Sequence, residues 1–215
     1  EQHNTTARDL AKLARALIVD FPEDYSLYAE REFKYNGITQ QNRNELLGDT
    51  TLGVDGIKTG HTEAAGYCLV SSAEKQGMRL ISVVMGTDSM GSRASESRKL
   101  LNYGFRFYTN VKAFAAGKPL KQAEVWKGEE ELVGVGLAQD AVLTVLKSEK
   151  DQLKANYKLN GKLMAPIQKG QVVGEVYFQM GDKVVKRMPM VALDKVEEAG
   201  FFGRMWDSMA LWFED

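Results

Sequence analysis

The chain has 215 residues, 44% of them hydrophobic and 27% charged, with a formal net charge of -1. This length can bury a substantial core and allows one large domain or two small ones. The near-neutral charge gives no electrostatic case for a nucleic-acid partner, and no apolar run is long enough to span a membrane as a helix. One cysteine and two histidines cannot form an internal disulfide or an ordinary zinc site, and no phosphate-binding Walker loop occurs, so no metal or cofactor is expected.

The first 44 residues predict helices followed by a turn and a polar loop. Apolar side chains recur at helical spacing from Leu10 to Ile18, and Thr6 with Asp9 resembles a helix-capping pair. This helix is expected to end near Pro22, because a proline interrupts helical hydrogen bonding. The elements expected further along are a short helix over residues 25–30, an extended piece over 32–35, a tight turn at 36–37 and an amide-rich loop over 39–44.

Residues 54–62, with the sequence VDGIKTGHT, predict a strand around which the other elements are arranged. Two more strand-like runs follow after glycine turns, at residues 67–70 and 79–85, which together predict an antiparallel three-strand meander. Cys68 lies in the first of these runs and is interpreted as a small buried hydrophobic residue. Alternation along the strand predicts two sets of side chains, with Lys58, Gly60 and Thr62 on one face and Ile57, Thr59 and His61 on the other.

The face that carries Lys58 has the chemistry to bind an anionic peptide. Lys58 supplies an ammonium group, Gly60 has no Cβ that would keep a ligand backbone away, and Thr62 offers a hydroxyl. An extended peptide can pair with such a strand while the lysine attracts its negative charge.

After the predicted meander, the sequence predicts a helix over residues 92–108. Leu101, Gly104, Phe105 and Tyr108 would form its core-facing side, and Arg93 falls on a polar position in the first turn. On sequence alone, an exposed Arg93 is an open alternative to an Arg93 that takes part in a binding site.

Composition changes at residues 115–119, which are expected to be a domain boundary. From residue 121 to 193 the chain alternates short β-type runs with glycine turns, a pattern typical of a small β-sandwich. The tail, residues 197–215, repeats large apolar residues at spacings of three and four, which predicts an amphipathic helix on a membrane surface or, alternatively, an ordinary packing helix. Arg204 is its only basic residue, against Asp207, Glu214 and Asp215, so its attraction to anionic lipid would be weak.

Lys-Thr-Gly on a strand is a signature element of the serine β-lactamases and penicillin-binding proteins. The segments that extend this signature are residues 42–44, 54–62, 66–67, 78–84, 96–101, 104–107, 165–167, 169–174 and 200–206. Together they resemble the low-molecular-mass penicillin-binding proteins that are D-alanyl-D-alanine carboxypeptidases, the penicillin-binding protein five and six group. The resemblance spans nearly the whole chain.

The resemblance implies an α+β fold with three parts. Residues 1–116 would be the C-terminal part of a β-lactamase or transpeptidase-like catalytic domain, with an antiparallel sheet and packed helices. Residues 117–194 would be a small all-β sandwich that holds the enzyme away from its membrane, and residues 195–215 an amphipathic helix that anchors the protein to the periplasmic face of the bacterial inner membrane.

The resemblance also implies the substrate and the residues that bind it. The substrate would be a peptidoglycan stem peptide that ends in D-Ala-D-Ala, and β-lactams would acylate the same enzyme. The substrate-binding residues implied are Lys58, Thr59, Gly60, His61 and Thr62 of the central strand, together with Arg43 of the amide-rich loop and Arg93 of the following helix.

The catalytic residues of that family are expected to lie outside this chain. Acyl transfer in the family needs a Ser-x-x-Lys element and a Ser-x-Asn element as well as Lys-Thr-Gly. Ser72 and Lys75 fit the first spacing, but they lie in a strand-like segment where they could not stack on one helix face, and no Ser-x-Asn occurs. An upstream segment is therefore expected to carry the serine, and this chain alone is expected to be inactive; Glu1 is also an unusual first residue, which suggests part of a longer polypeptide.

Two other interpretations remain at this point. In one, the chain is a non-enzymatic fragment or pseudo-enzyme that serves as a binding or scaffold module at the membrane. In the other it belongs to a soluble β-lactamase, which explains Lys-Thr-Gly but gives the β-sandwich and the aromatic tail no purpose.

Overall fold

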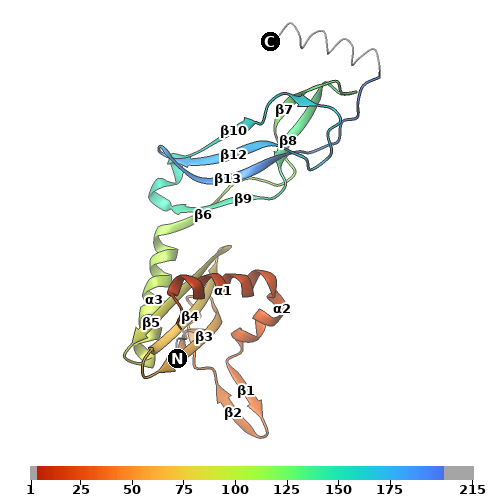
Figure 1. The fold of residues 1–215 in the computed structure, drawn as a ribbon. Helices are drawn as coiled ribbons and strands as arrows, with labels where there is room; N and C mark the ends of the chain where they lie inside the picture. Colours follow the sequence, from red (N-terminus) through yellow and green to blue (C-terminus); the bar gives the residue numbers. More distant parts are fainter. Residues whose placement is uncertain (1–3, 201–215) are drawn as a thin grey trace. The chain divides into compact units, whose positions relative to one another are not determined.

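The computed structural model describes residues 4–200, and it divides the chain into two compact units at Thr109 and Asn110 (Figure 1). We call residues 4–109 the first unit and residues 110–200 the second unit. This division falls ahead of the expected boundary at residues 115–119. The reason is that strand β6 (Tyr108–Phe114) pairs with a strand of the second unit, β9 (Ala141–Leu146).

The first unit combines a three-stranded sheet with helices. Its elements in chain order are α1 (Ala7–Asp20), α2 (Pro22–Tyr25), the 3-10 helix η1 (Ser26–Ala29), β1 (Glu32–Tyr35), β2 (Ile38–Gln41), the 3-10 helix η2 (Glu45–Gly48), β3 (Val54–Thr62), β4 (Gly66–Lys75), β5 (Met78–Thr87) and α3 (Met90–Phe107). The sheet has the antiparallel order β3-β4-β5, so the predicted meander is confirmed. Strand β3 is an edge strand, while β1 and β2 form a separate hairpin.

The two long helices begin where side chains can cap them. Thr6 caps α1 by accepting a hydrogen bond from the backbone N–H of Asp9, as the capping pair predicted. Ser89 caps α3 by accepting from the N–H of Ser92, so that helix begins ahead of the predicted start at residue 92. The expected short helix at residues 25–30 is instead the end of α2 followed by the 3-10 turn η1.

Each face of the sheet has its own small core. Leu69 and Ala73 of β4 pack with Leu101 of α3, and Ile57 of β3 packs with Ala14 of α1. Burial of these side chains holds a helix on each face, with a stabilisation of about 1.5–3 kcal/mol for each large side chain removed from water.

Two sequence expectations about β4 can now be checked. Ser72 and Lys75 both lie in this strand, and the Ser72 hydroxyl accepts a hydrogen bond from Arg79, so they do not form a nucleophile and base on a helix. Cys68 was expected to be buried, but it is partly exposed because it lies opposite Gly60, which has no side chain to cover it.

The second unit consists almost entirely of strands. Besides β6 and β9 it contains β7 (Pro119–Trp126), β8 (Leu132–Leu137), the 3-10 helix η3 (Lys147–Gln152), β10 (Leu153–Leu159), β11 (Leu163–Met164), β12 (Val172–Met180) and β13 (Lys183–Ala192). Six strands form a sheet in the order β10-β12-β13-β8-β7-β11, and β6 and β9 form a second sheet. The two sheets share one core, to which β9 contributes every second residue.

The fold is therefore built mainly from sheets, with few helices. No helix within residues 4–200 is both long and apolar enough to cross a membrane. The amphipathic helix expected over residues 195–215 lies mostly outside the described residues, since the description ends at residue 200.

Candidate substrate-binding site

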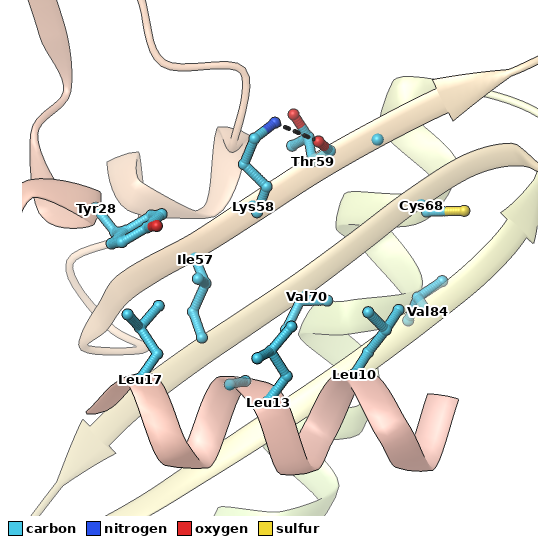
Figure 2. Close-up of a pocket in the computed structure, with 12 residues that line it drawn as sticks. Leu10, Leu13, Leu17, Tyr28, Ile57, Lys58, Thr59, Cys68, Val70 and Val84 are labelled. Carbon is cyan, nitrogen blue, oxygen red and sulfur yellow. Dashed lines mark hydrogen bonds between the residues drawn. The ribbon is translucent and has the colours of Figure 1, made fainter. Parts of the chain in front are cut away.

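A mostly apolar groove of about 340 Å³ runs beside strand β3 in the first unit. Figure 2 shows Leu10, Leu13 and Leu17 of α1 on one side of this groove and the strands of the sheet on the other. Lys58, Thr59 and Gly60 of β3 are among the residues that line it. The Lys-Thr-Gly sequence therefore lies on an edge strand at the margin of an apolar groove.

The Lys58 ammonium is exposed and available for a ligand. Its Nζ donates a hydrogen bond to the backbone oxygen of Thr59 at 2.7 Å, and within residues 4–200 no carboxylate pairs with it. A carbonyl neutralises no charge, so the ammonium remains free to attract an anion. A lysine ammonium is a compact, mobile charge, and it lacks the planar geometry with which an arginine guanidinium binds both oxygens of a carboxylate.

Gly60 leaves the strand open next to Lys58. In the register of β3 and β4, Lys58 lies opposite Val70 and Gly60 lies opposite Cys68. Directly opposed residues of an antiparallel pair share a face, and all four line the groove. A Cβ added at Gly60 would meet nothing closer than the Cβ of Cys68, at 4.0 Å. A ligand backbone can therefore approach the strand closely at this position.

The predicted alternation of the strand describes this groove only in part. Ile57 and Thr59 were expected on the face opposite Lys58, yet both also line the groove. Strand β3 is an edge strand and its pairing with β4 shifts register between Val54 and Gly56. That shift lies before Ile57, and the pairing is regular from Gly56 to Thr62, so the groove takes its lining from successive residues along this edge strand and not from one face alone.

His61 and Thr62 lie at the end of β3, beyond the groove. The His61 ring lies against Tyr67 of β4 in a tilted arrangement, with 3.9 Å between the ring centroids and 34° between the ring planes. The Thr62 hydroxyl accepts a hydrogen bond from the N–H of Ala65 in the turn to β4. Both residues shape the end of the strand, and both are exposed to solvent.

Arg93 is buried, which corrects the alternative of an exposed arginine in the first helical turn. Only 3% of the residue is exposed. Its guanidinium donates to the backbone oxygen of Gly60 at 3.3 Å and to the backbone oxygen of Arg43 at 3.2 Å, and it lies over the Tyr67 ring. Arg93 thus joins the β3 strand to the loop that carries Arg43. The Arg43 residue itself is exposed.

Four side chains that the sequence interpretation did not single out also hold this region. The Asn44 amide donates to the backbone oxygen of Gly56 at 3.0 Å. Asp55 accepts hydrogen bonds from Arg79 and from the Tyr25 hydroxyl. The available signal was an aspartate near the start of the predicted strand over residues 54–62, with an arginine at the start of a later strand of the same meander.

One titratable group in this region has a strongly shifted pKa. Burial, together with the hydrogen bond to the Asp55 carboxylate, raises the pKa of Tyr25 well above its ordinary value of 10.0. The hydroxyl therefore stays protonated and keeps donating to Asp55 across the physiological pH range.

The arrangement favours binding rather than complete catalysis. It offers a cation, an open strand edge and an apolar groove, which suit an extended peptide with a terminal carboxylate. Among the described residues no helix carries a serine three residues ahead of a lysine, and there is no cluster of three or more metal-binding side chains.

Comparison with known protein families accounts for both units. Residues 1–89 match the family model described as D-alanyl-D-alanine carboxypeptidase, and residues 108–198 match the model described as penicillin-binding protein 5, C-terminal domain. The fold and the Lys-Thr-Gly strand thus define a penicillin-binding protein class with a peptidase-type domain followed by a β domain. The chain belongs to the low-molecular-mass penicillin-binding proteins of the D-alanyl-D-alanine carboxypeptidase family.

The similarity to individual relatives extends over nearly the whole chain. It is 47% identical to the D-alanyl-D-alanine carboxypeptidase DacA of Escherichia coli K12 over 97% of this chain and 52% of the relative. It is 44% identical to DacC of the same organism, with the same coverage of 97% and 52%. The chain therefore spans about half the length of the curated relatives it matches.

Solved structures agree with this assignment. Penicillin binding protein 5 from Haemophilus influenzae has a TM-score of 0.83 at 41% identity, covering 90% of this chain and 57% of that one. Penicillin binding protein 6B from Escherichia coli has a TM-score of 0.64 at 40% identity, covering 87% of this chain and 50% of that one.

Proposed function

We propose that this chain forms one wall of the active-site cleft of a serine-type D-alanyl-D-alanine carboxypeptidase. The enzyme would hydrolyse the terminal D-Ala-D-Ala bond of peptidoglycan stem pentapeptides through an acyl-serine intermediate, and β-lactams would acylate the same serine. An upstream segment would supply the Ser-x-x-Lys and Ser-x-Asn elements. The observation that carries this proposal is the exposed Lys58 ammonium beside the open Gly60 position on an edge strand.

The residues of the site would share the work of substrate binding. Lys58 would attract the terminal carboxylate, and the backbone around Thr59 and Gly60 would pair with the substrate as an added strand. His61, Thr62 and Arg43 would contact the substrate further along. Arg93 would position the strand and the Arg43 loop for substrate binding, because its guanidinium binds the backbone carbonyls of Gly60 and Arg43.

Each part of the chain would have its own role in the whole enzyme. Residues 1–116 would complete a transpeptidase-like catalytic domain with the upstream segment, and residues 117–194 would form the β-sandwich that separates it from the membrane. Residues 195–215 would anchor the protein as an amphipathic helix on the periplasmic face of the inner membrane. The peptidoglycan substrate supports an extracytoplasmic location.

Covalent labelling with a fluorescent penicillin tests the proposal. The chain alone is expected to take up no label, because the nucleophilic serine is absent. The chain joined to an upstream segment with the two missing elements is expected to be labelled and to release D-alanine from a pentapeptide. Labelling of the chain alone, or no labelling of the folded joined protein, would contradict the proposal and favour a binding or scaffold module.

A further inference from the structure

The start of strand β3 is held by a network of polar side chains that the proposed reaction does not use. Arg79 Nη1 donates to both oxygens of Asp55, at 2.9 and 2.7 Å, and the Tyr25 hydroxyl donates to Asp55 Oδ1 at 2.6 Å. The same guanidinium donates to the Ser72 hydroxyl at 2.8 Å and to the Glu74 carboxylate at 2.5 Å. Asp55 is thereby connected to α2, β4 and β5 at once.

This network lies where the ladder between β3 and β4 is interrupted. Strand β3 is bonded to a neighbour on one side only, and its ladder with β4 shifts register between Val54 and Gly56. Asp55 is the residue left without a partner in that register. Bulges are frequent next to active sites, where they redirect the chain that follows.

The residue after Asp55 is also fixed by its surroundings. The Tyr25 hydroxyl lies 2.8 Å from the position that a Cβ on Gly56 would occupy, so Tyr25 packs directly against this backbone. The backbone oxygen of Gly56 accepts a hydrogen bond from Asn44. Lys58 follows two residues later along the same strand. The direction of the Lys58 segment is therefore set at Asp55 and Gly56.

We propose that Tyr25, Asp55 and Arg79 are positioning residues that fix the bulge at the start of β3 and so hold Lys58 where it meets the substrate carboxylate. This inference rests on the proposed function. The side chains of Asp55 and Arg79 are 30% and 28% exposed. Ion pairs at such exposure contribute little to stability, so the geometry they impose is the larger part of their effect.

The test uses the joined, full-length protein and compares Asp55→Asn with Tyr25→Phe. Acylation by a fluorescent penicillin is resolved into the dissociation constant of the first complex and the acylation rate constant. Asp55→Asn is expected to lower the second-order rate constant about tenfold, mainly by weaker binding. Tyr25→Phe is expected to lower it about threefold, because Arg79 still holds both oxygens of Asp55.

A matched control removes another ion pair of the same unit. Asp49 pairs with Arg98 of α3 at 3.1 Å and also accepts hydrogen bonds from Thr51 in the loop before β3, but it has no hydrogen bond to Tyr25, Asp55 or Arg79 among the described residues. Asp49→Asn is expected to change acylation by less than about twofold. If Asp55→Asn acylates as fast as the wild type, or if both variants lose acylation in proportion to their melting temperatures, the positioning role is overturned.

Hydrogen exchange on the chain alone separates this inference from the proposed function. Asp55→Asn is expected to accelerate exchange of the amides of residues 57–60 while those of residues 69–73 in β4 stay protected. Asp49→Asn should leave both sets unchanged. If the joined wild-type protein takes up no penicillin, the proposed function fails. Faster exchange at residues 57–60 in Asp55→Asn would still support the role of Asp55 in fixing the start of β3. Unchanged exchange there overturns it.

Discussion

The two units of this chain differ in how they use their apolar residues. In the second unit, one core takes in side chains from both sheets, including the fully buried Val135, Leu137 and Phe178. The first unit has two small clusters, while Leu13 and Phe21 are 66% and 57% exposed. The polar groups that suit a substrate also lie in the first unit. The second unit therefore buries its apolar residues in one shared core, whereas the first unit has smaller cores and leaves more of its large apolar side chains exposed.

The largest effect on stability is expected in the second unit. Phe178 is completely buried and its ring lies 6.0 Å from that of Phe114. Phe178→Ala should lower the free energy of unfolding of this unit by about 3–5 kcal/mol, because it removes apolar contact and leaves a cavity. Val142→Ala, on the outward side of β9, is the control and should change it by less than about 1 kcal/mol. Urea unfolding of residues 108–200 measures both; equal effects would show that this core is not the source of stability.

The next largest effect concerns binding rather than stability. Gly60→Val adds a side chain into open space, so the protein should still fold, but acylation of the joined protein by penicillin should fall about 100-fold, or about 2.7 kcal/mol. Gly53→Ala is the contrasting variant. Gly53 has φ of +64° and an added Cβ would collide with the backbone oxygen of Glu74, so this change should lower the melting temperature instead. Stopped-flow acylation with thermal melts measures both, and unchanged acylation in Gly60→Val would remove the need for an open strand.

A smaller effect is expected from the raised pKa of Tyr25. Above pH 10 the unfolded chain releases the tyrosine proton while the folded chain keeps it, so this residue lowers the free energy of unfolding by about 1.4 kcal/mol per pH unit. Below pH 10 its contribution is constant. Denaturation between pH 9 and about pH 11 should therefore show a steeper loss of stability in the wild type than in Tyr25→Phe. Parallel curves would mean that the Tyr25 hydroxyl is not held in its protonated form.

The smallest effect is expected on the exposed side of α3. Lys99 pairs with Glu96 at 2.6 Å, and both side chains are about half or more exposed, at 68% and 49%. Lys99→Ala should change the free energy of unfolding by less than about 0.5 kcal/mol, because water and salt screen such pairs. Calorimetry of the joined protein measures it. A larger loss of stability would show that exposed ion pairs contribute substantially to the stability of the first unit.

The sequence predicted the elements whose signals are local. The Thr6 cap, the end of α1 and the meander of β3 to β5 follow from helical spacing, glycine turns and alternation, and the structure has all of them. Lys58 and Gly60 were recognised because the Lys-Thr-Gly signature is contiguous in the chain.

What the sequence could not predict depends on residues that are far apart in the chain. The burial of Arg93 follows from carbonyls at Arg43 and Gly60, which are brought beside it only by the fold. The contacts of Asp55 with Tyr25 and Arg79 likewise join separate elements, and the bulge at Asp55 follows from pairing between strands rather than from composition. Helical and strand periodicity contain no information about such contacts.

Acylation of the joined protein carrying Lys58→Ala tests most directly whether the ammonium at the strand edge binds the ligand carboxylate. The account predicts a fall of at least about 100-fold in the second-order rate constant for penicillin, with a melting temperature like that of the wild type, because the Lys58 side chain is exposed and forms no ion pair among residues 4–200. Lys99→Ala should acylate normally. A Lys58→Ala protein that acylates at the wild-type rate would contradict the account.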